Sequence, residues 1–216
     1  MSIAARNAIL ADGAAPGPTP AYWGLCFTAE AANSSVQLTA VGSPPAVTLV
    51  KSFDGINWEA YAVGEVIDLP STGDLVYLAA GEGGNESFGS SASAYHKFVI
   101  NGLVAASGDI TSLRRFDLEQ TTLADYCYAS MFRDCTGLTS APELPATALA
   151  DYCYYYMFRN CAKLSLIRVH FTAWGKQTTK WVTSVSSAGT FYKPSALSEE
   201  FGESKIPTGW TVVNID

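Results

Sequence analysis

The chain has 216 residues, and 48% of them are hydrophobic, which is enough to bury the core of one large or two small domains. Its net charge is −7, and its thirteen Lys and Arg residues are scattered, which argues against a nucleic-acid-binding protein. No apolar run approaches the roughly 18 residues of a membrane-spanning helix, so membrane insertion is not predicted. The uncharged polar surface that this composition implies suits adhesive hydrogen-bonding contacts.

Residues 1–20 are dominated by Ala, Gly and Pro and predict an arm rather than a regular element. The segment has neither the long apolar stretch nor the cleavage site of a secretory signal, so this sequence is not expected to direct its own export. Two interpretations stay open for the arm: it anchors the protein to a partner, or it is a floppy terminus.

Residues 21–109 show short runs rich in β-branched and aromatic residues, which predict an antiparallel β-sandwich-like domain. Asp54-Gly55 stands between two apolar runs and predicts a hairpin, because glycine takes a positive φ at little cost. This turn also explains the neighbouring oxygens of Asn57 and Glu59 without a calcium loop. The Gly/Ser-rich stretch 81–94 lacks large aliphatic residues and predicts an exposed loop.

A repeat follows. LADYCYASMFRDCTGL at 123–138 recurs as LADYCYYYMFRNCAKL at 149–164, an offset of 26 residues with eleven of sixteen positions identical. A repeat of this length predicts stacked supersecondary units. Apolar residues recur at every fourth position of each copy and predict a buried helix face; in the first copy they are Leu123, Cys127, Met131 and Cys135. The prolines of the segment between the copies permit only a short extended stretch.

After the second copy, residues 171–185 predict a third helix, and the segments 187–194 and 206–213 predict final strands. Two complete copies are fewer than the three or so that a solenoid usually needs. The β-domain and the aromatic C-terminal segment are therefore expected to cap the stack, and burial by partner chains is the alternative.

Four of the five cysteines sit at equivalent places in the two copies, as the pairs Cys127/Cys153 and Cys135/Cys161. This pattern predicts stacked, buried free thiols that pack as small apolar groups. Disulfides or a metal site are the alternatives, although a spacing of eight within each copy does not fit a zinc knuckle. We therefore expect no metal and no cofactor. Cys26 stands alone and is expected in a strand.

Consecutive tyrosines in the second copy provide the candidate contact site. Neighbouring residues of a helix point about 100° apart, so Tyr152, Tyr154, Tyr155 and Tyr156 cannot all face inward. The first copy has Ala129 and Ser130 where the second has Tyr155 and Tyr156, which predicts that these positions lie outside the packed stripe. The candidate contacts for a protein or glycan are Tyr152, Tyr155, Tyr156, Ala129 and Ser130. A subunit contact or harmless exposure is the alternative.

The sequence does not predict an enzyme. Its only histidines, His96 and His170, lie outside recognisable motifs, and no phosphate-binding glycine motif occurs. Glu199, Glu200 and Glu203 form an acidic patch, but their loop predicts a solvated surface rather than a paired-carboxylate site. We expect no catalytic residues.

The repeat units, the segment APELPATALA between them and the endings WVTSVSSAGTFYKPSA and IPTGWTVVNID resemble the BspA-type leucine-rich repeats of bacteria of the Bacteroides group and of their bacteriophages. The segments SFDGINW and FVINGLVAASGDITSL resemble the β-domain that often precedes such repeats. The resemblance covers about residues 45–216. It implies a surface or adhesion protein, without common catalytic residues to carry over.

The expected fold class is therefore α+β. After the arm at 1–20, a β-sandwich-like domain at 21–109 precedes a leucine-rich-repeat module at 110–216, a short solenoid of helix-plus-strand units with a 26-residue period and a C-terminal cap. The expected function is that of a non-enzymatic phage virion protein: a head fibre, capsid decoration or tail adhesin. Its expected partners are other virion proteins or a host surface protein or glycan, and a homo-oligomer is expected, with a trimer among the alternatives. The second hypothesis is a secreted adhesin of the bacterial cell surface.

Overall fold

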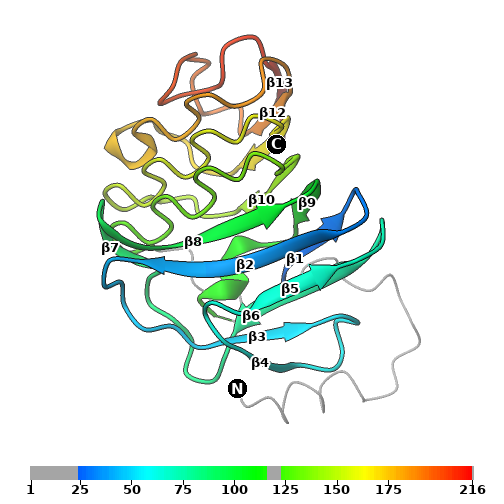
Figure 1. Ribbon diagram of the computed structural model, residues 1–216. Helices are drawn as coiled ribbons and strands as arrows, with labels where there is room; N and C mark the ends of the chain where they lie inside the picture. Colours follow the sequence, from blue (N-terminus) through cyan, green and yellow to red (C-terminus); the bar gives the residue numbers. More distant parts are fainter. Residues whose placement is uncertain (1–23, 116–122, 216) are drawn as a thin grey trace, which may run out of the picture.

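The computed structural model describes residues 24–115 and 123–215, so the expected arm at 1–20 lies outside the described residues. Two antiparallel sheets come first, with the strand orders β4-β3-β6-β1-β9 and β5-β2-β8-β7 (Figure 1). Their strands are β1 Leu25–Ala29, β2 Ser34–Val41, β3 Leu49–Ser52, β4 Glu59–Tyr61, β5 Val66–Leu69, β6 Leu75–Ala80, β7 Gly89–Ser91, β8 Ala94–Asn101 and β9 Val104–Ser107. The strand-like runs of the sequence therefore do form antiparallel sheets.

The alternation of side chains along the strands builds the core between these sheets. In β1, Leu25 and Phe27 are fully buried, and on β2 so are Val36 and Leu38. The rings of Phe27 on β1 and Phe98 on β8 meet edge to face, with 4.8 Å between their centroids. Each sheet thus contributes one apolar face to a shared interior.

Two turn predictions in this part have different outcomes. The hairpin at Asp54-Gly55 is confirmed: Gly55 has a φ of +73°, and the Asp54 carboxylate accepts hydrogen bonds from the N–H groups of Ile56 and Asn57. The prediction of an exposed loop at 81–94 is wrong. Residues 89–91 form strand β7. Phe88 is buried against the first copy of the repeat: its N–H donates to the Cys127 carbonyl, and its ring stacks on Tyr128.

The two copies of the repeat are not helices. Each is a run of tight turns, which we call the first coil (123–138) and the second coil (149–164); a third coil follows at 173–186. In the first coil every fourth residue is left-handed, with φ of 55° at Tyr126, 58° at Ser130 and 67° at Asp134. An α-helix needs right-handed residues throughout, so its i to i−4 hydrogen bonds cannot form here.

The hydrogen bonds of the coils alternate in direction. The N–H of Met131 bonds back to the Tyr128 carbonyl in its own coil (3.2 Å), whereas the N–H of Ser130 bonds forward to Tyr155 in the next coil (2.7 Å). Neighbouring coils are thereby joined by their backbones, as strands are. Because the turns repeat every four residues, the buried side chains also recur at i and i+4. An amphipathic helix shows the same pattern, so the sequence predicted a helix here.

Short strands close the other side of the stack as a parallel sheet. They are β10 Ser140–Leu144, β11 Leu166–Val169, β12 Thr190–Lys193 and β13 Thr211–Asn214. The register pairs Ser140 with Leu166, then Leu166 with Thr190 and Thr190 with Thr211, so the period shortens from 26 residues to 24 and to 21. The predicted final strands are confirmed by β12 and β13.

The α+β prediction is therefore wrong, and with it the solenoid of helix-plus-strand leucine-rich repeats. Besides strands, the described ranges contain only the short 3-10 helices η1 Ile110–Leu113 and η2 Lys176–Thr178. The third helix predicted over 171–185 is instead the third coil, in which Lys180 and Ser184 are left-handed. The fold is nearly all β, with two antiparallel sheets followed by a parallel one.

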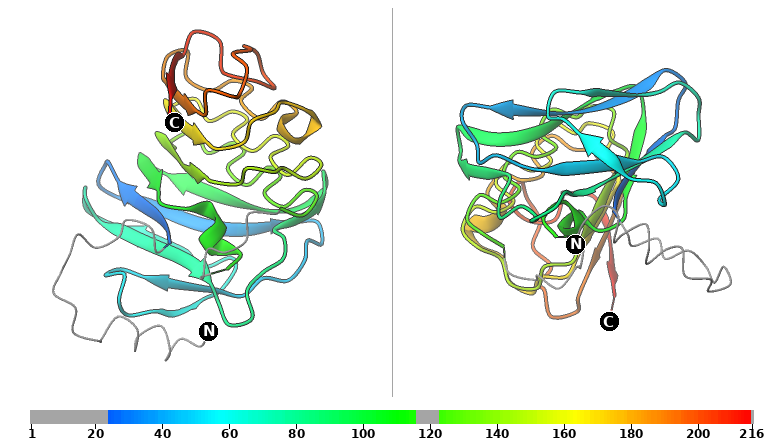
Figure 2. Two further views of the ribbon diagram at one scale, coloured as in Figure 1. Left: turned by 180° about the vertical axis from the view of Figure 1, so that it is seen from behind. Right: turned by 90° about the horizontal axis from the view of Figure 1, so that it is seen from below.

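The solenoid is continuous with the sandwich. β10 runs beside β9, where the Thr139 N–H donates to the Val104 carbonyl and the Glu143 N–H to that of Gly108. Seen from behind, the strands of the parallel sheet follow one another from the sandwich toward the C-terminus (Figure 2). One hydrophobic cluster extends from Leu25 to Trp210. The sandwich thus covers the first coil. This is the capping role that was expected of the β-domain, because two copies are fewer than a solenoid usually needs.

The four cysteines of the repeat are buried free thiols, which confirms the prediction of a stacked core. Two of the sulfurs donate to backbone carbonyls one layer away: Cys161 to Phe132 at 3.0 Å, and Cys135 to Phe98 at 3.2 Å. Cys26 is a free thiol in β1, as expected.

Candidate functional site

Four tyrosines form a group on the outside of the first and second coils. Tyr126 and Tyr152 stack with 5.1 Å between ring centroids, and Tyr155 and Tyr156 stack at 3.9 Å. Tyr155 also meets the other pair edge to face, 6.5 Å from Tyr126 and 6.0 Å from Tyr152. All four rings are partly exposed. We call this group the tyrosine face.

The backbone holds the tyrosine face in place. Tyr126, Tyr152 and Tyr156 are left-handed residues of their coils, so each sits at a tight turn. The Tyr126 N–H donates to the Asp151 carbonyl (3.0 Å) and the Tyr156 N–H to that of Thr179 (3.2 Å), which ties each turn to the next coil. The rings therefore project from a backbone that is fixed on both sides.

The predicted contact residues divide into two groups. Tyr152, Tyr155 and Tyr156 lie at the surface as predicted, and Tyr154 points inward, with no exposed area. The expectation that Ala129 and Ser130 lie outside the packed layer is wrong, because they are 1% and 0% exposed.

The second coil lies against these two residues, because the Ser130 N–H donates to the Tyr155 carbonyl of that coil (2.7 Å). From the same coil, the ring of Tyr155 reaches that of Tyr126 and the ring of Tyr156 reaches the Arg133 guanidinium. Tyr126 was not singled out from the sequence, although its recurrence as Tyr152 was a usable signal.

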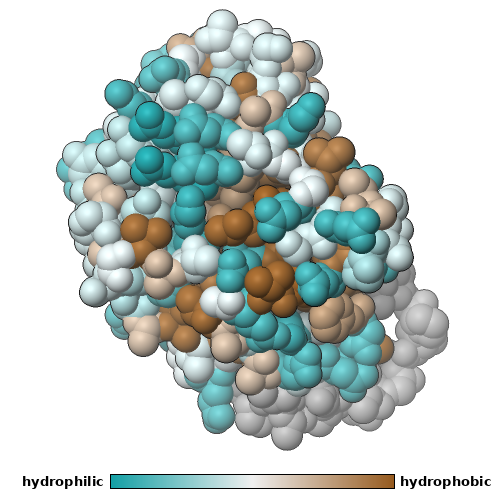
Figure 3. All heavy atoms as spheres, viewed as in Figure 1, coloured by the Kyte–Doolittle hydropathy of each residue, from teal (hydrophilic) through white to brown (hydrophobic). Residues whose placement is uncertain are grey.

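Cations surround one end of the tyrosine face. The guanidinium carbons of Arg159 and Arg133 lie 4.7 and 5.7 Å from the ring centroid of Tyr156. At the other end Lys176 lies over Tyr152, 5.8 Å from its centroid, and pairs with Asp151. Figure 3 shows hydrophilic side chains gathered over the coils, in the upper left of the view.

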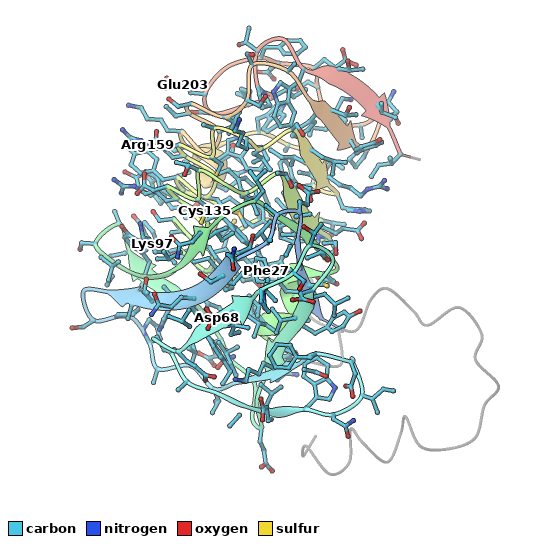
Figure 4. The ribbon with its side chains drawn as sticks, turned by 45° about the vertical axis from the view of Figure 1, so that its right-hand side comes forward. Phe27, Asp68, Lys97, Cys135, Arg159 and Glu203 are labelled. Atoms are coloured by element: carbon cyan, nitrogen blue, oxygen red, sulfur yellow. The ribbon has the colours of Figure 1, made fainter. Side chains whose placement is uncertain are left out.

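A second acidic residue stands at the edge of the cationic end. Asp134 lies 3.3 Å from the Lys97 ammonium and 3.5 Å from Arg133, and it accepts a 2.8 Å hydrogen bond from Asn160. Figure 4 shows Lys97 and Arg159 along the same side of the molecule, with Cys135 in the interior. The charges of this surface thus come from successive coils and from β8.

The stacked residues Tyr155 and Tyr156 have different hydroxyl pKa values, because of the hydrogen bond between them and the nearby positive charges. A hydrogen bond to Tyr156 raises the pKa of Tyr155 to about 12. The same bond lowers the pKa of Tyr156, and the positive charges of Lys180, Arg159 and Arg133 lower it further. A hydroxyl in that position is a good hydrogen-bond donor to an anionic group.

The other residues considered from the sequence have structural partners. His96 is buried, its Nδ1 lies 3.1 Å from the Phe88 carbonyl oxygen, and burial lowers its pKa. His170 contacts the Glu143 carboxylate at 2.7 Å. In the acidic loop, Glu200 pairs with Lys205 at 2.9 Å. Over residues 24–115 and 123–215 there is no group of three or more His, Cys, Asp or Glu residues that could hold a metal ion.

Comparison with protein-family models gives no match, and comparisons with curated proteins and with solved structures give none either. The resemblance of residues 45–216 to BspA-type repeats therefore stays a prediction. None of the helices among the described residues has the length and apolar character needed to cross a membrane.

Proposed function

We propose that this protein is a non-enzymatic attachment protein that contacts its partner through the tyrosine face. The observation that supports this proposal is the set of four stacked, partly exposed rings on an interlocked backbone. Tyrosine offers a large contact area and a hydroxyl while losing little side-chain entropy on binding. Rings that already stack on one another lose still less, because their rotamers are restricted before the partner arrives.

The setting that we propose is a phage particle, with the protein as a head fibre, a capsid decoration or a tail adhesin. The resemblance of the repeats to those of the Bacteroides group and its phages supports this setting. A sandwich and solenoid that share one core and a continuous edge-to-edge backbone contact suit a rigid spacer, with the sandwich toward the particle and the coils outward. A homo-oligomer, such as a trimer, belongs to the same proposal and is measured by light scattering.

Binding to cells tests the attachment role. The full chain is labelled, and its binding to Bacteroides-group cells is measured by flow cytometry beside a variant carrying Tyr152→Ala and Tyr156→Ala. The matched control is Tyr192→Ala, which removes a partly exposed tyrosine with an arginine over its ring from the parallel sheet instead. We expect the double variant to bind at least tenfold less and the control to bind as the unaltered protein does. Equal binding by a folded double variant would refute the proposal.

Mass spectrometry of purified particles tests the setting separately. Detection of the protein in virions at a fixed ratio to the major capsid protein supports the phage assignment. Its recovery only from the outer surface of bacterial cells would overturn that assignment in favour of a bacterial adhesin.

A further inference from the structure

We infer that the tyrosine face binds an acidic saccharide, with the tyrosines stacking on the sugar rings and Arg159 and Lys180 pairing with a carboxylate or sulfate of the ligand. This inference rests on the proposed attachment function and names the class of its ligand.

Beside the tyrosine face, this acidic protein has a local excess of positive charge. Lys97, Arg133, Arg159 and Lys180 supply four cations, and Asp134 is the carboxylate that pairs with two of them, Lys97 and Arg133. Among the described residues, Arg159 and Lys180 have no carboxylate within 4.0 Å. With a net charge of −7 for the whole chain, this patch opposes the overall charge and suits a ligand that carries an anionic group.

Arg159 is held against an aromatic ring of the tyrosine face. Its guanidinium lies over the Tyr156 ring, and its Nε is buried with no hydrogen-bond partner among the described residues. Ring stacking positions the planar guanidinium but accepts none of its N–H groups. An arginine held in this way keeps its outer N–H groups for a carboxylate or sulfate, which guanidinium binds with two parallel hydrogen bonds.

Equivalent positions of the second and third coils carry side chains of different chemistry. Tyr156 is hydrogen-bonded through its N–H to the backbone of Thr179, and the next residue, Lys180, is exposed and occupies the place of Tyr156 in the third coil. At these two equivalent positions the surface therefore changes from the ring of Tyr156 in the second coil to the ammonium of Lys180 in the third. An elongated ligand with uncharged sugar rings at one end and an acidic group at the other matches that order.

A saccharide fits this surface better than an apolar peptide does. A peptide that binds through large apolar side chains needs exposed apolar residues or a groove to receive them. Of the exposed large hydrophobic side chains in the described ranges, none belongs to the first or second coil; several, including Phe53, Ile56 and Val66, belong to the sandwich. Tyrosine rings combine an apolar surface with a hydroxyl that can hydrogen-bond, as the two faces and the rim of a sugar require.

Isothermal titration calorimetry on the full chain tests the inference at low salt. The probes are a galacturonic acid hexamer, a sulfated maltohexaose, neutral maltohexaose and a hexaglutamate peptide. We expect at least one acidic saccharide to bind tenfold or more tightly than neutral maltohexaose, and its affinity to fall with added salt because screening weakens ion pairs. The galacturonate and the sulfated probe distinguish a carboxylate from a sulfate as the recognised group.

Two variants identify the residues. Arg159→Gln combined with Lys180→Gln should weaken the acidic saccharide at least tenfold, and Tyr152→Ala should weaken it while leaving its salt dependence unchanged. The matched control, Arg168→Gln, removes a cation that lies over Tyr192 on the parallel sheet and should bind normally.

Three results would overturn the inference: no binding of either acidic saccharide, unaltered binding by the Arg159→Gln/Lys180→Gln variant, or hexaglutamate binding as tightly as the saccharides. If cell binding still depends on Tyr152 and Tyr156 after such a result, the proposed attachment function stands and only its ligand class fails.

Discussion

The rings of Tyr128 and Tyr154 stack in the core with 6.3 Å between their centroids, yet their hydroxyls differ in hydrogen bonding. Tyr128 donates to the Ile110 carbonyl, whereas the buried Tyr154 hydroxyl has no hydrogen-bond partner within residues 24–115 and 123–215. The two residues are equivalent positions of the repeat, so the difference arises from the neighbouring layers. At Tyr128 that layer includes η1, and at Tyr154 it is the third coil with Trp181.

This difference predicts opposite effects of the same substitution. Tyr154→Phe should raise the free energy of unfolding by about 1 kcal/mol, because it removes a buried polar group that has no partner. Tyr128→Phe should lower it by about 1 kcal/mol, because it leaves the Ile110 carbonyl without its donor. Urea unfolding of the two variants measures both values. A loss of stability in Tyr154→Phe comparable to that in Tyr128→Phe would contradict the expectation.

Gly137 is predicted to tolerate no side chain. A Cβ at this position would collide with the backbone carbonyl of Gly102, where the first coil meets the sandwich. Gly137→Ala should therefore destabilise the protein by about 1–3 kcal/mol or prevent folding. Lys163 occupies the same place in the second copy and is exposed, so Lys163→Ala is the control and should change stability by less than about 0.5 kcal/mol. Thermal melts that rank the two variants equally would show that the junction relaxes.

The buried thiols predict a loss of stability in alkali. Burial raises the pKa of Cys127 to about 11 and that of Cys135 to about 12, from an ordinary value of 9.0 that applies to the unfolded chain. A raised pKa in the folded state contributes stability that is complete below pH 9 and is lost as the pH rises above it. Each thiol should lower the free energy of unfolding by up to about 1.4 kcal/mol per pH unit between pH 9 and its folded pKa.

Urea unfolding at pH 7.5, 9 and 10 measures this slope, and Cys127→Ala should reduce it by one thiol's share. The same burial should keep the thiols of the native protein slow to react with a thiol reagent at pH 8, with all five reacting after unfolding. A fast reaction of the repeat cysteines in the native protein would show that the coils open.

Lys193 is predicted to hold the C-terminal end of the solenoid. It is only 2% exposed, and its ammonium donates to the carbonyls of Leu197 (2.6 Å) and Pro194 (3.3 Å) and to the Asn214 side chain (3.1 Å). Lys193→Met should cost about 1–3 kcal/mol, because these acceptors lose their donor. It should also speed hydrogen exchange in β12 and β13, while Lys163→Met at the exposed position should leave both unchanged. Unaltered exchange in the C-terminal strands would rule out this role.

The repeat could be predicted from the sequence, but its backbone conformation could not. The identity of the two copies located the repeat, and the pairing of Cys127 with Cys153 correctly predicted a buried ladder. The same copies suggested helices, because a turn that recurs every four residues buries the same positions as a helix does. The third coil was predicted as a third helix and was not recognised as a further copy, because its spacing is 24 residues rather than 26 and Trp181 occupies the place of Met157.

The surface was predictable only in part. The sequence implied that the four tyrosines of the second copy could not all face inward, and three of them, Tyr152, Tyr155 and Tyr156, are partly exposed. Ala129 and Ser130 are buried where the second coil lies against the first, with the Ser130 N–H bonded to the Tyr155 carbonyl, and no local pattern encodes that contact. The cationic end of the tyrosine face likewise combines residues from β8 and three coils. These residues are far apart along the chain, so the sequence alone does not show that their charges form one patch.

By itself, the sequence determined that a unit is stacked on its own copy, that the cysteines of that unit are interior and that extended segments end the chain, since each follows from local composition and period. Only the tertiary structure decided that the unit is a coil of turns. The left-handed residues Tyr126 and Ser130 are costly for an isolated chain, and they persist because their N–H groups find carbonyl partners in the next coil, about 25 residues later in the chain.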